Sequence, residues 1–277
     1  MENNLKNLLL KHGVRLTKAY GQNFLTDDSL LEEIVLNAGI DEQTTVLEIG
    51  PGAGALTRHI AKRAKKVIAY EIDVRLKPVL QETVGGFNNV EVVFKDVLKE
   101  KLSVLEGKLG GEYVMVANLP YYITTPIVMN FLENAKNINS LVIMVQKEVA
   151  DRFTSPPSTT DYGAITVGIN LRGRAKTVLQ VPREMFTPPP NVDSAVVKID
   201  IERGKFDGVH LDEIREVVKR AFMNRRKMLV NNLMNFYKVD REKAESWLVQ
   251  CDISKTARAE NLTCEDFVKL SNVINGK

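Results

Sequence analysis

The segment NLPY at residues 118–121 places an amide, a proline and a tyrosine where an apolar run ends. The exocyclic amine of a nucleobase is a weak nucleophile because its lone pair is delocalised into the ring. Hydrogen bonds from that amine to the Asn118 side-chain oxygen and the Leu119 carbonyl would favour a pyramidal nitrogen with an available lone pair. Pro120 stiffens the turn, and Tyr121 offers a face for base stacking, worth roughly 1–3 kcal/mol. The segment indicates group transfer to the amine of a flat substrate, driven mainly by orientation.

A glycine loop, EIGPGAGAL at residues 48–56, follows an apolar run and precedes a segment of helical spacing. Glycines allow the backbone to approach a ligand closely, and the helix N-terminus presents free N–H groups. The residues Gly50, Gly52 and Ala55 fit the dinucleotide pattern, and Glu71 lies about twenty residues further on, where a ribose would be held. On these two features a NAD enzyme remains open.

Three acids at successive strand ends favour a different ligand, S-adenosylmethionine. Glu48 would face its amino acid end together with the glycine loop, Glu71 its ribose diol, and Asp96, with Val97 beside it, its adenine amine. Ligands of open α/β sheets bind outside the carboxyl ends of the strands, where these acids are expected. This donor carries no pyrophosphate that would need neutralisation.

The elements that must position these residues form a repeating pattern. Short β-branched runs recur at intervals of roughly twenty to twenty-five residues and predict buried parallel strands. They lie at residues 44–50, 66–73, 89–96, 112–118 and 140–146. Helical spacing lies between them at 56–64 and 125–135, and before them at 29–38, where Asp28 or Ser29 can cap the start and Gly39 the end. The alternation predicts an α/β fold with a doubly wound, Rossmann-like methyltransferase sheet.

The pattern changes after residue 150. An exposed loop is expected at 153–163, and 164–173 is ambiguous between strand and helix. Two strands at 176–182 and 193–201 resemble a hairpin-like addition to the sheet. From residue 205 the chain is expected to be helical, with candidates at 211–223, 227–237, 241–250 and 264–274. We therefore expect a catalytic domain at 1–204, with an N-terminal lid at 1–25, and a small all-α, RNA-contacting domain at 205–277.

The composition of the chain bears on whether it is a membrane, disulfide-rich, metal-binding or nucleic-acid-binding protein. With 44% apolar and 26% charged residues, and no apolar run long enough to span a membrane, a globular cytoplasmic protein is expected. Cys251 and Cys264 form no CxxC pair, and His12, His59 and His210 are scattered, so no disulfide or metal site is expected. The net charge of +3 does not by itself indicate a nucleic acid partner.

One basic segment does indicate a nucleic acid partner. The segment from residue 215 to 227, on a predicted helix and its turn, contains six basic residues and one acidic residue, Glu216. We expect them to contact RNA phosphates, although a solvated helix face with some residues contacting the rest of the protein is the alternative. The six are Arg215, Lys219, Arg220, Arg225, Arg226 and Lys227.

Seven motifs in collinear order, from about residue 15 to 235, resemble the ribosomal RNA adenine N6-dimethyltransferase family, and most closely its bacterial small-subunit (16S) type. They are KAYGQNFLTD, LEIGPGAGALT, YEID, KDVL, ANLPYYITTPI, MFTPPPNVDSAVV and AFMNRRKMLVNNL. The chain departs from the family pattern at Asn191, where a basic residue is frequent, and at Tyr122, where a smaller or polar residue is common. Both departures concern local contacts to RNA.

The resemblance implies a role for several positions. Asn23 and Leu25, with Gln22 beside them, correspond to a lid over the cofactor, and Gly50 to the loop glycine nearest the ligand. Glu71 and Asp96 correspond to the ribose-binding and adenine-binding acids, and Asn118 to a residue shared between cofactor and target amine. Tyr121 and Phe186 resemble the two aromatic walls of the target pocket. From its sequence context alone, Phe186 is a core aromatic.

The function implied is S-adenosylmethionine-dependent dimethylation of N6 on two adjacent adenines near the 3′ end of small-subunit rRNA, during ribosome biogenesis. S-adenosylhomocysteine would be the product, an immature 30S particle the partner, and a monomer the active form. One rival is a large-subunit rRNA methyltransferase, which AFMNRRKMLVNNL disfavours. Another is an RNA-binding assembly factor without turnover, which the acids and NLPY disfavour; the third is the NAD enzyme.

Overall fold

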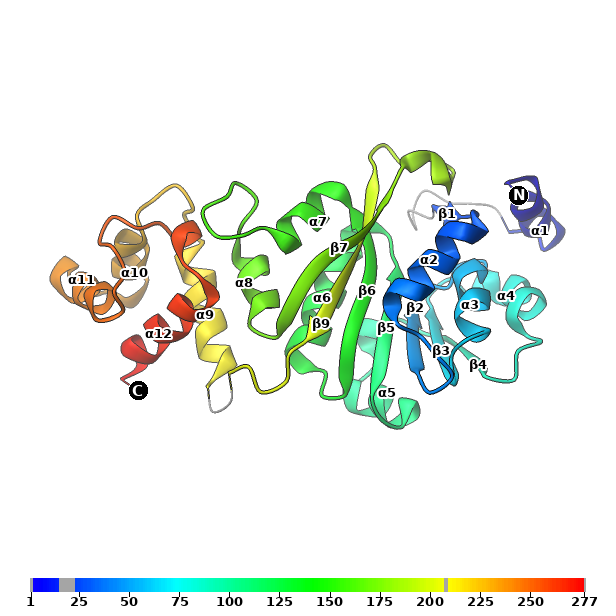
Figure 1. Cartoon of the computed structure of the whole chain (residues 1–277), viewed down its shortest axis with the longest axis horizontal. Coiled ribbons are helices and arrows are strands. Elements are labelled where there is room, and N and C mark those ends of the chain that lie inside the picture. Colours follow the sequence, from blue (N-terminus) through cyan, green and yellow to red (C-terminus); the bar gives the residue numbers. More distant parts are fainter. Residues whose placement is uncertain (1, 15–22, 207–208, 277) are drawn as a thin grey trace. The chain divides into compact units, whose positions relative to one another are not determined.

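The computed structural model describes residues 2–14, 23–206 and 209–276 (Figure 1). The chain divides into two compact units, one of residues 1–150 and 176–201, the other of residues 151–175 and 202–277. The second break falls close to the expected boundary after residue 204. The difference lies in residues 151–175, which pack with the C-terminal helices instead of the catalytic part.

A seven-stranded sheet forms the centre of the first unit. Its strands are β2 (Thr45–Ile49), β3 (Lys66–Glu71), β4 (Val90–Phe94), β5 (Tyr113–Asn118), β6 (Ile138–Gln146), β7 (Gly173–Val181) and β9 (Ser194–Ile201). The spatial order is β4-β3-β2-β5-β6-β9-β7. Strands β2 to β6 pair in parallel, as expected, and β9 runs antiparallel to β6. The hairpin-like addition is confirmed, since β9 and β7 are neighbours at one edge.

Helices cover both faces of this sheet. Figure 1 shows α2 (Asp28–Ala38) and α3 (Ala55–Ala61) on its near face, with α5 (Leu102–Leu109) and α6 (Tyr121–Asn134) behind it. Valines of β2, β3, β5 and β6 form one apolar cluster with buried residues of α2 and α3. The chain passes from β2 through β3 to β4 on one side and then returns to add β5 and β6 on the other side of β2, so the sheet is doubly wound.

Smaller elements complete the described chain of this unit. They are α1 (Glu2–Lys11), α4 (Lys77–Val84), α7 (Lys147–Thr154), which continues past residue 150, and the short helices η2 (Val74–Leu76), η3 (Val97–Lys99) and η4 (Arg183–Met185). A separate two-stranded ladder joins β1 (Phe24–Leu25) to β8 (Phe186–Thr187). It pairs Leu25 with Phe186, so the expected lid and the expected target wall share one backbone ladder.

The start of α2 differs from the expectation. Asp27, not Asp28 or Ser29, is the N-cap, and its side chain accepts a hydrogen bond from the Leu30 N–H at 2.9 Å. Gly39 closes the helix as expected, with φ of 71° in the left-handed region that glycine adopts without a Cβ clash. The cap provides a hydrogen-bond acceptor for one of the N–H groups that have no partner within the helix at its start.

The NLPY segment also differs in one respect. Helix α6 begins at Tyr121 instead of residue 125, and Pro120 is its N-cap with φ of −53°. The fixed φ of proline suits a chain that leaves β5 and enters a helix within two residues. Tyr121 is therefore held on the first turn of a helix.

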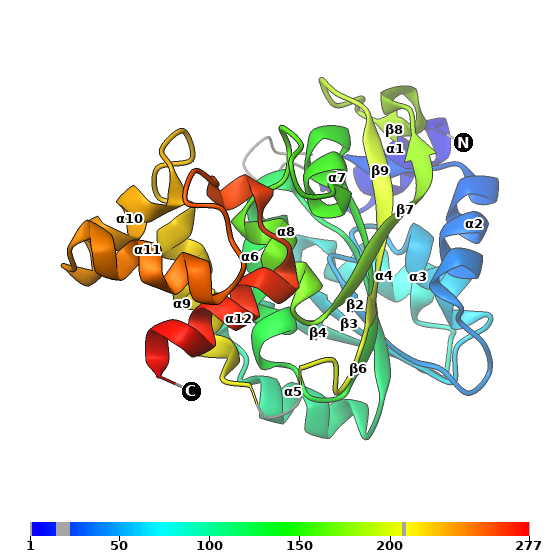
Figure 2. The same cartoon turned by 60° about the vertical axis from the view of Figure 1, so that its left-hand side comes forward.

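The second unit is helical. It contains α8 (Ala164–Asn170), α9 (Leu211–Ala221), α10 (Leu229–Tyr237), α11 (Arg241–Gln250), η5 (Ala259–Asn261) and α12 (Cys264–Asn275). Figure 2 shows the helices from α9 to α12 packed together, and their buried side chains form one core. The ambiguous segment 164–173 is thus a helix followed by the first residue of β7.

The expected exposed loop at 153–163 is anchored to this core. Tyr162 is fully buried, and its hydroxyl donates a hydrogen bond to the Leu262 carbonyl at 2.8 Å. Val167 and Leu171 of the following segment belong to the same cluster as residues of α9 and α12. This packing explains why residues 151–175 belong to the helical unit.

The described ranges lack two features. No helix there is long and apolar enough to cross a membrane. No group of three or more His, Cys, Asp and Glu side chains there could hold a metal ion.

Candidate active site

A pocket lies where β2 to β5 end. The spatial order of the strands along this edge is β4-β3-β2-β5. Residues at their ends therefore follow one another across the sheet, in the order Asp96, Glu71, the glycine loop and Asn118. Every described residue expected at the cofactor and target sites lines this pocket, while Gln22 lies outside the described residues. They are Asn23, Leu25, Glu48, Gly50, Gly52, Glu71, Asp96, Val97, Asn118, Leu119, Pro120, Tyr121 and Phe186.

Glycines of the loop are required by geometry. Gly50 has φ of 74°, and a Cβ placed on it would lie 3.2 Å from the Leu119 side chain and 3.5 Å from the Asn118 carbonyl oxygen. At Gly52, with φ of 58°, a Cβ would lie 3.0 Å from the Phe24 ring. The loop therefore packs directly against NLPY on one side and the lid on the other. Larger side chains there would close the space between them.

Glu71 is fixed by backbone donors. Its Oε2 accepts a hydrogen bond from the Gly52 N–H at 3.1 Å and its Oε1 one from the Asp73 N–H at 2.9 Å. The Ile72 N–H also donates to this carboxylate, which has about four acceptor positions, so room remains for a ligand diol. Burial raises the pKa of Glu71, and these backbone bonds oppose the rise.

Glu48 is the most buried acid of the pocket, at 1% exposed. Within the described chain its Oε2 has no hydrogen-bond partner. Burial raises its pKa to about 8; the nearby Thr57 hydroxyl opposes the rise, and the charge of Glu71 adds to it. A buried carboxylate oxygen without a donor is costly unless a ligand supplies one. The site therefore suits a ligand with a positively charged donor group.

The charge of the lining argues against a dinucleotide. Among the described residues that line the pocket, Lys95 is the cation, and Glu100 pairs with its ammonium at 3.0 Å. A pyrophosphate would meet three acidic side chains here, whereas a cationic ligand would be attracted. S-adenosylmethionine, with an ammonium and a sulfonium, fits this donor set, and the NAD alternative does not.

Asp96 and its neighbours form the far end of the pocket. The Asp96 side chain caps η3 by accepting a hydrogen bond from the Leu98 N–H at 3.0 Å, which fixes one of its oxygens. Val97 is buried beside it. Ile72 was not expected in the site, yet it lines the pocket and is largely exposed although apolar. The signal available in the sequence was an apolar residue directly after the acid in YEID.

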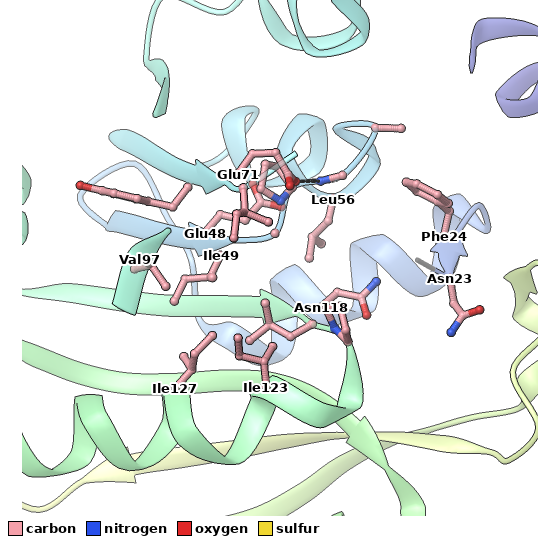
Figure 3. A pocket seen from close by; sticks show the side chains of 18 of the residues that line it. Asn23, Phe24, Glu48, Ile49, Leu56, Glu71, Val97, Asn118, Ile123 and Ile127 are labelled. Carbon is pink, nitrogen blue, oxygen red and sulfur yellow. Dashed lines mark hydrogen bonds between the residues drawn. The ribbon is translucent and has the colours of Figure 1, made fainter. Parts of the chain in front are cut away.

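On the opposite side lie Asn118 and Tyr121. Figure 3 shows Asn118 across the cavity from Glu48 and Glu71, with Asn23 on the lid side. Asn118 is half-buried, and in the described part of the chain its side chain has no hydrogen-bond partner. The Tyr121 hydroxyl lies 2.8 Å from the Ser194 hydroxyl, which fixes the ring. Burial raises the pKa of Tyr121, so the phenol stays neutral.

Phe186 is both a core aromatic and a lining residue. It is 3% exposed and belongs to the apolar cluster that contains Leu25 and Leu31. The ladder of β1 and β8 sets Leu25 directly opposite it. Its position is thus fixed by packing from several elements, as a pocket wall requires.

Half of the basic segment is engaged within the helical unit. Arg215, with 19% of its side chain exposed, pairs with Asp212 at 2.9 Å. Arg220 pairs with Glu216 and lies 3.7 Å above the centre of the Phe236 ring.

Arg225 is engaged over a longer span. Its Nε donates to Glu260 at 2.9 Å, and its Nη2 donates to the Thr159 and Thr160 carbonyls. It therefore ties the turn after α9 to the segment that follows α7. These bonds give it a structural task whether or not RNA is present.

The other basic residues are exposed. Lys219 lies on α9, and Arg226 and Lys227 lie on the turn that follows it. Within the described residues none of the three forms an ion pair. Contact with RNA phosphates stays a prediction, and the structure favours these three positions for it.

The fold and the strand-end pocket define the class: a Rossmann-like S-adenosylmethionine-dependent methyltransferase. The family model for "Ribosomal RNA adenine dimethylase" matches residues 13–276. The chain belongs to this family.

Curated relatives are named for the small ribosomal subunit. "Ribosomal RNA small subunit methyltransferase A" of Bacillus pumilus is 44% identical over 276 residues, covering 97% of this chain and 94% of its own. The protein of the same name from Enterococcus faecalis is 43% identical over 279 residues, with 97% and 94% covered.

Two solved structures are similar in fold and sequence. A dimethyladenosine transferase from Plasmodium falciparum superposes with a TM-score of 0.76 at 28% identity, covering 89% of this chain and 95% of that one. The 23S rRNA methyltransferase ErmE gives a TM-score of 0.71 at 30% identity, with 91% and 100% covered. A protein named a dimethyladenosine transferase and one named a 23S rRNA methyltransferase thus share this architecture.

Proposed function

We propose that this enzyme dimethylates N6 of two adjacent adenines near the 3′ end of small-subunit (16S) rRNA during ribosome biogenesis. S-adenosylmethionine is the donor and S-adenosylhomocysteine the product. The observation that carries the proposal is Asn118, whose half-buried amide has no partner in the described chain and lines the acid-containing pocket together with Tyr121. The names of the curated relatives support the choice of the small subunit.

The residues that would hold the donor follow from the geometry. The free positions on Glu71 suit the ribose diol, Asp96 the adenine amine with Val97 packed beside it, and the orphan oxygen of Glu48 the ammonium. The backbone of Gly50 and Gly52 suits close approach. Asn23 and Leu25 would cover the ligand from the lid side. When bound, the donor supplies a methyl group on a sulfonium, a carbon open to in-line attack.

The chain's own contribution is orientation. The Asn118 side-chain oxygen and the Leu119 carbonyl accept hydrogen bonds from the target amine, which holds its lone pair toward the cavity. Tyr121 and Phe186 hold the base from its faces. As the N–C bond forms and the S–C bond breaks, the amine proton becomes acidic and leaves to water, so no strong base and no metal is required. Positioning of this kind supplies most of the rate.

RNA recognition is proposed for the exposed basic residues. Lys219, Arg226 and Lys227 contact phosphates of the RNA, and Arg215, Arg220 and Arg225 mainly support the helices that carry them. A base paired in a helix hides its amine, so the target is an extruded or unpaired adenine. The substrate is an immature 30S particle in the cytoplasm, and the enzyme acts as a monomer.

A methylation assay tests the proposal. Labelled S-adenosylmethionine is incubated with small subunits that lack the modification, and the RNA is digested and its adenosines are analysed by mass. Dimethyladenosine confined to a 3′-terminal fragment is expected. Label in large-subunit RNA alone would favour the activity named for ErmE. Absence of label from both RNAs would contradict the proposal.

A further inference from the structure

Tyr122 is an exposed aromatic residue at the mouth of the pocket. It lines the pocket, yet 67% of it is open to solvent. Within the described chain its hydroxyl has no hydrogen-bond partner. An exposed aromatic ring beside a binding site offers a flat face on which a nucleobase can stack.

The adjacent Tyr121 differs in burial and in hydrogen bonding. Tyr121 is half-buried and its hydroxyl is tied to Ser194, so its ring is fixed inside the pocket. Both residues lie on the first turn of α6, where consecutive side chains point about 100° apart. Tyr121 therefore lies in the interior of the pocket, and Tyr122 lies at its rim. The backbone of both is held by the same helix.

We propose that Tyr122 stacks against the base next to the target adenine, which makes it a binding site for a flanking nucleobase of the RNA. This inference rests on the proposed function. When one base is extruded, its neighbour loses a stacking partner, which costs a few kcal/mol. An aromatic ring at the rim restores that stacking, worth roughly 1–3 kcal/mol. With two adjacent adenines as targets, the base held at Tyr122 during one reaction is the substrate of the other.

Tyr122 is a positioning residue in this scheme. It acts on the affinity for RNA and on which base enters the pocket, and it does not touch the reacting amine. Stacking needs the ring and not the hydroxyl, so phenylalanine should replace it and alanine should not. The neighbouring base is needed as well, which allows the two partners to be removed separately and together.

The experiment uses small-subunit particles reconstituted with RNA whose 3′ part is synthetic. One set carries the two adjacent adenines, and the other carries one adenine next to an abasic nucleotide. The full-length wild type, Tyr122→Phe, Tyr122→Ala and Leu36→Ala are compared. Leu36 is a matched control because it is a largely exposed apolar residue on α2 outside the pocket lining.

Tyr122→Ala is expected to raise KM for the two-adenine particle about 5- to 150-fold, the range that corresponds to the lost stacking. Its kcat, thermal stability and affinity for S-adenosylhomocysteine should match the wild type. On the abasic particle the wild type and Tyr122→Ala should have the same KM. Tyr122→Phe and Leu36→Ala should behave as the wild type on both particles.

A direct readout of stacking accompanies the kinetics. With 2-aminopurine in place of the flanking adenine, binding of the wild type and of Tyr122→Phe should quench its fluorescence, and Tyr122→Ala should not. An unchanged KM for Tyr122→Ala, or an equal loss on both particles, would overturn the inference while leaving the proposed function intact. Failure of the wild type to methylate either particle would remove the proposed function and the inference with it.

Discussion

The strand-end pocket and the basic segment at 215–227 were expected from the same sequence, but the structure uses their residues differently. In the pocket, all described candidates line one cavity. In the basic segment, Arg215, Arg220 and Arg225 are bound to acids, a ring or carbonyls of their own unit. Only part of that segment is left exposed for a partner.

The difference has a physical cause. Parallel βαβ order brings the carboxyl ends of the strands to one edge, so the position of Glu71 or Asn118 is decided by backbone topology. The partner of a surface arginine is decided by which acids and carbonyls the tertiary fold brings near its long side chain. Residue type and spacing therefore predict the pocket better than they predict the basic surface.

The largest expected effect tests the pocket. Asn118→Ala removes a side-chain oxygen proposed to orient the amine, and kcat should fall about 10²- to 10³-fold, the range for losing one oriented polar group. Single-turnover methylation of small subunits measures it, and RNA affinity should change little. Asn134→Ala, on the last turn of α6 and outside the pocket lining, is the control. Turnover equal to the wild type would remove Asn118 from the mechanism.

A smaller effect tests the buried acid. Glu48 has a pKa raised to about 8 by burial, so the folded state keeps a proton that the unfolded state loses above about pH 4.5. The stability of the ligand-free enzyme should therefore fall as pH rises from 4.5 to 8. Glu48→Gln should remove this fall, and at pH 8 it should be more stable than the wild type by roughly 1–3 kcal/mol.

Thermal unfolding at pH 5.5 and pH 8 measures the effect of Glu48→Gln, with the exposed Glu91→Gln on β4 as control. The same substitution should weaken binding of S-adenosylhomocysteine at pH 8, because the ligand ammonium loses its partner. A stability difference that is equal at both pH values would show that Glu48 does not titrate in this range.

The smallest expected effects distinguish basic residues that stabilise the helical unit from basic residues that contact RNA. Arg225→Ala should lower stability by about 1 kcal/mol, since its hydrogen bonds are partly exposed. Lys227→Ala should leave stability unchanged and reduce the slope of log affinity against log salt by roughly 0.7–0.9, one phosphate contact. Thermal unfolding and salt-dependent binding to small subunits measure both. If Lys227→Ala leaves the salt slope unchanged, this residue does not contact phosphate.

The parallel strands and the pocket residues were predictable, because each follows from a local sequence pattern and the βαβ topology brings the strand ends together. The N-cap of α2 was not, since Asp27, Asp28 and Ser29 are all good caps. The choice depends on where the extended chain turns into the helix, which the structure places at Asp27 with φ of −83° and ψ of 112°. Such a boundary is decided by the contacts of the preceding segment.

The membership of residues 151–175 was also not predictable from local pattern. Tyr162 reads as part of a polar loop, but its hydroxyl binds a carbonyl one hundred positions away, at Leu262. Arg220 likewise meets Phe236 from the next helix. Contacts of this kind depend on the packed core, and no short window of sequence contains both partners.

The short ladder between β1 and β8 has a thermodynamic consequence. Leu25 on the donor side and Phe186 on the base side are paired through one backbone register. A ligand that binds on either side and stabilises the ladder reduces the free-energy cost of ordering the residues on the other side. Such coupling is reciprocal, so the factor by which RNA changes the affinity for the donor equals the factor by which the donor changes the affinity for RNA.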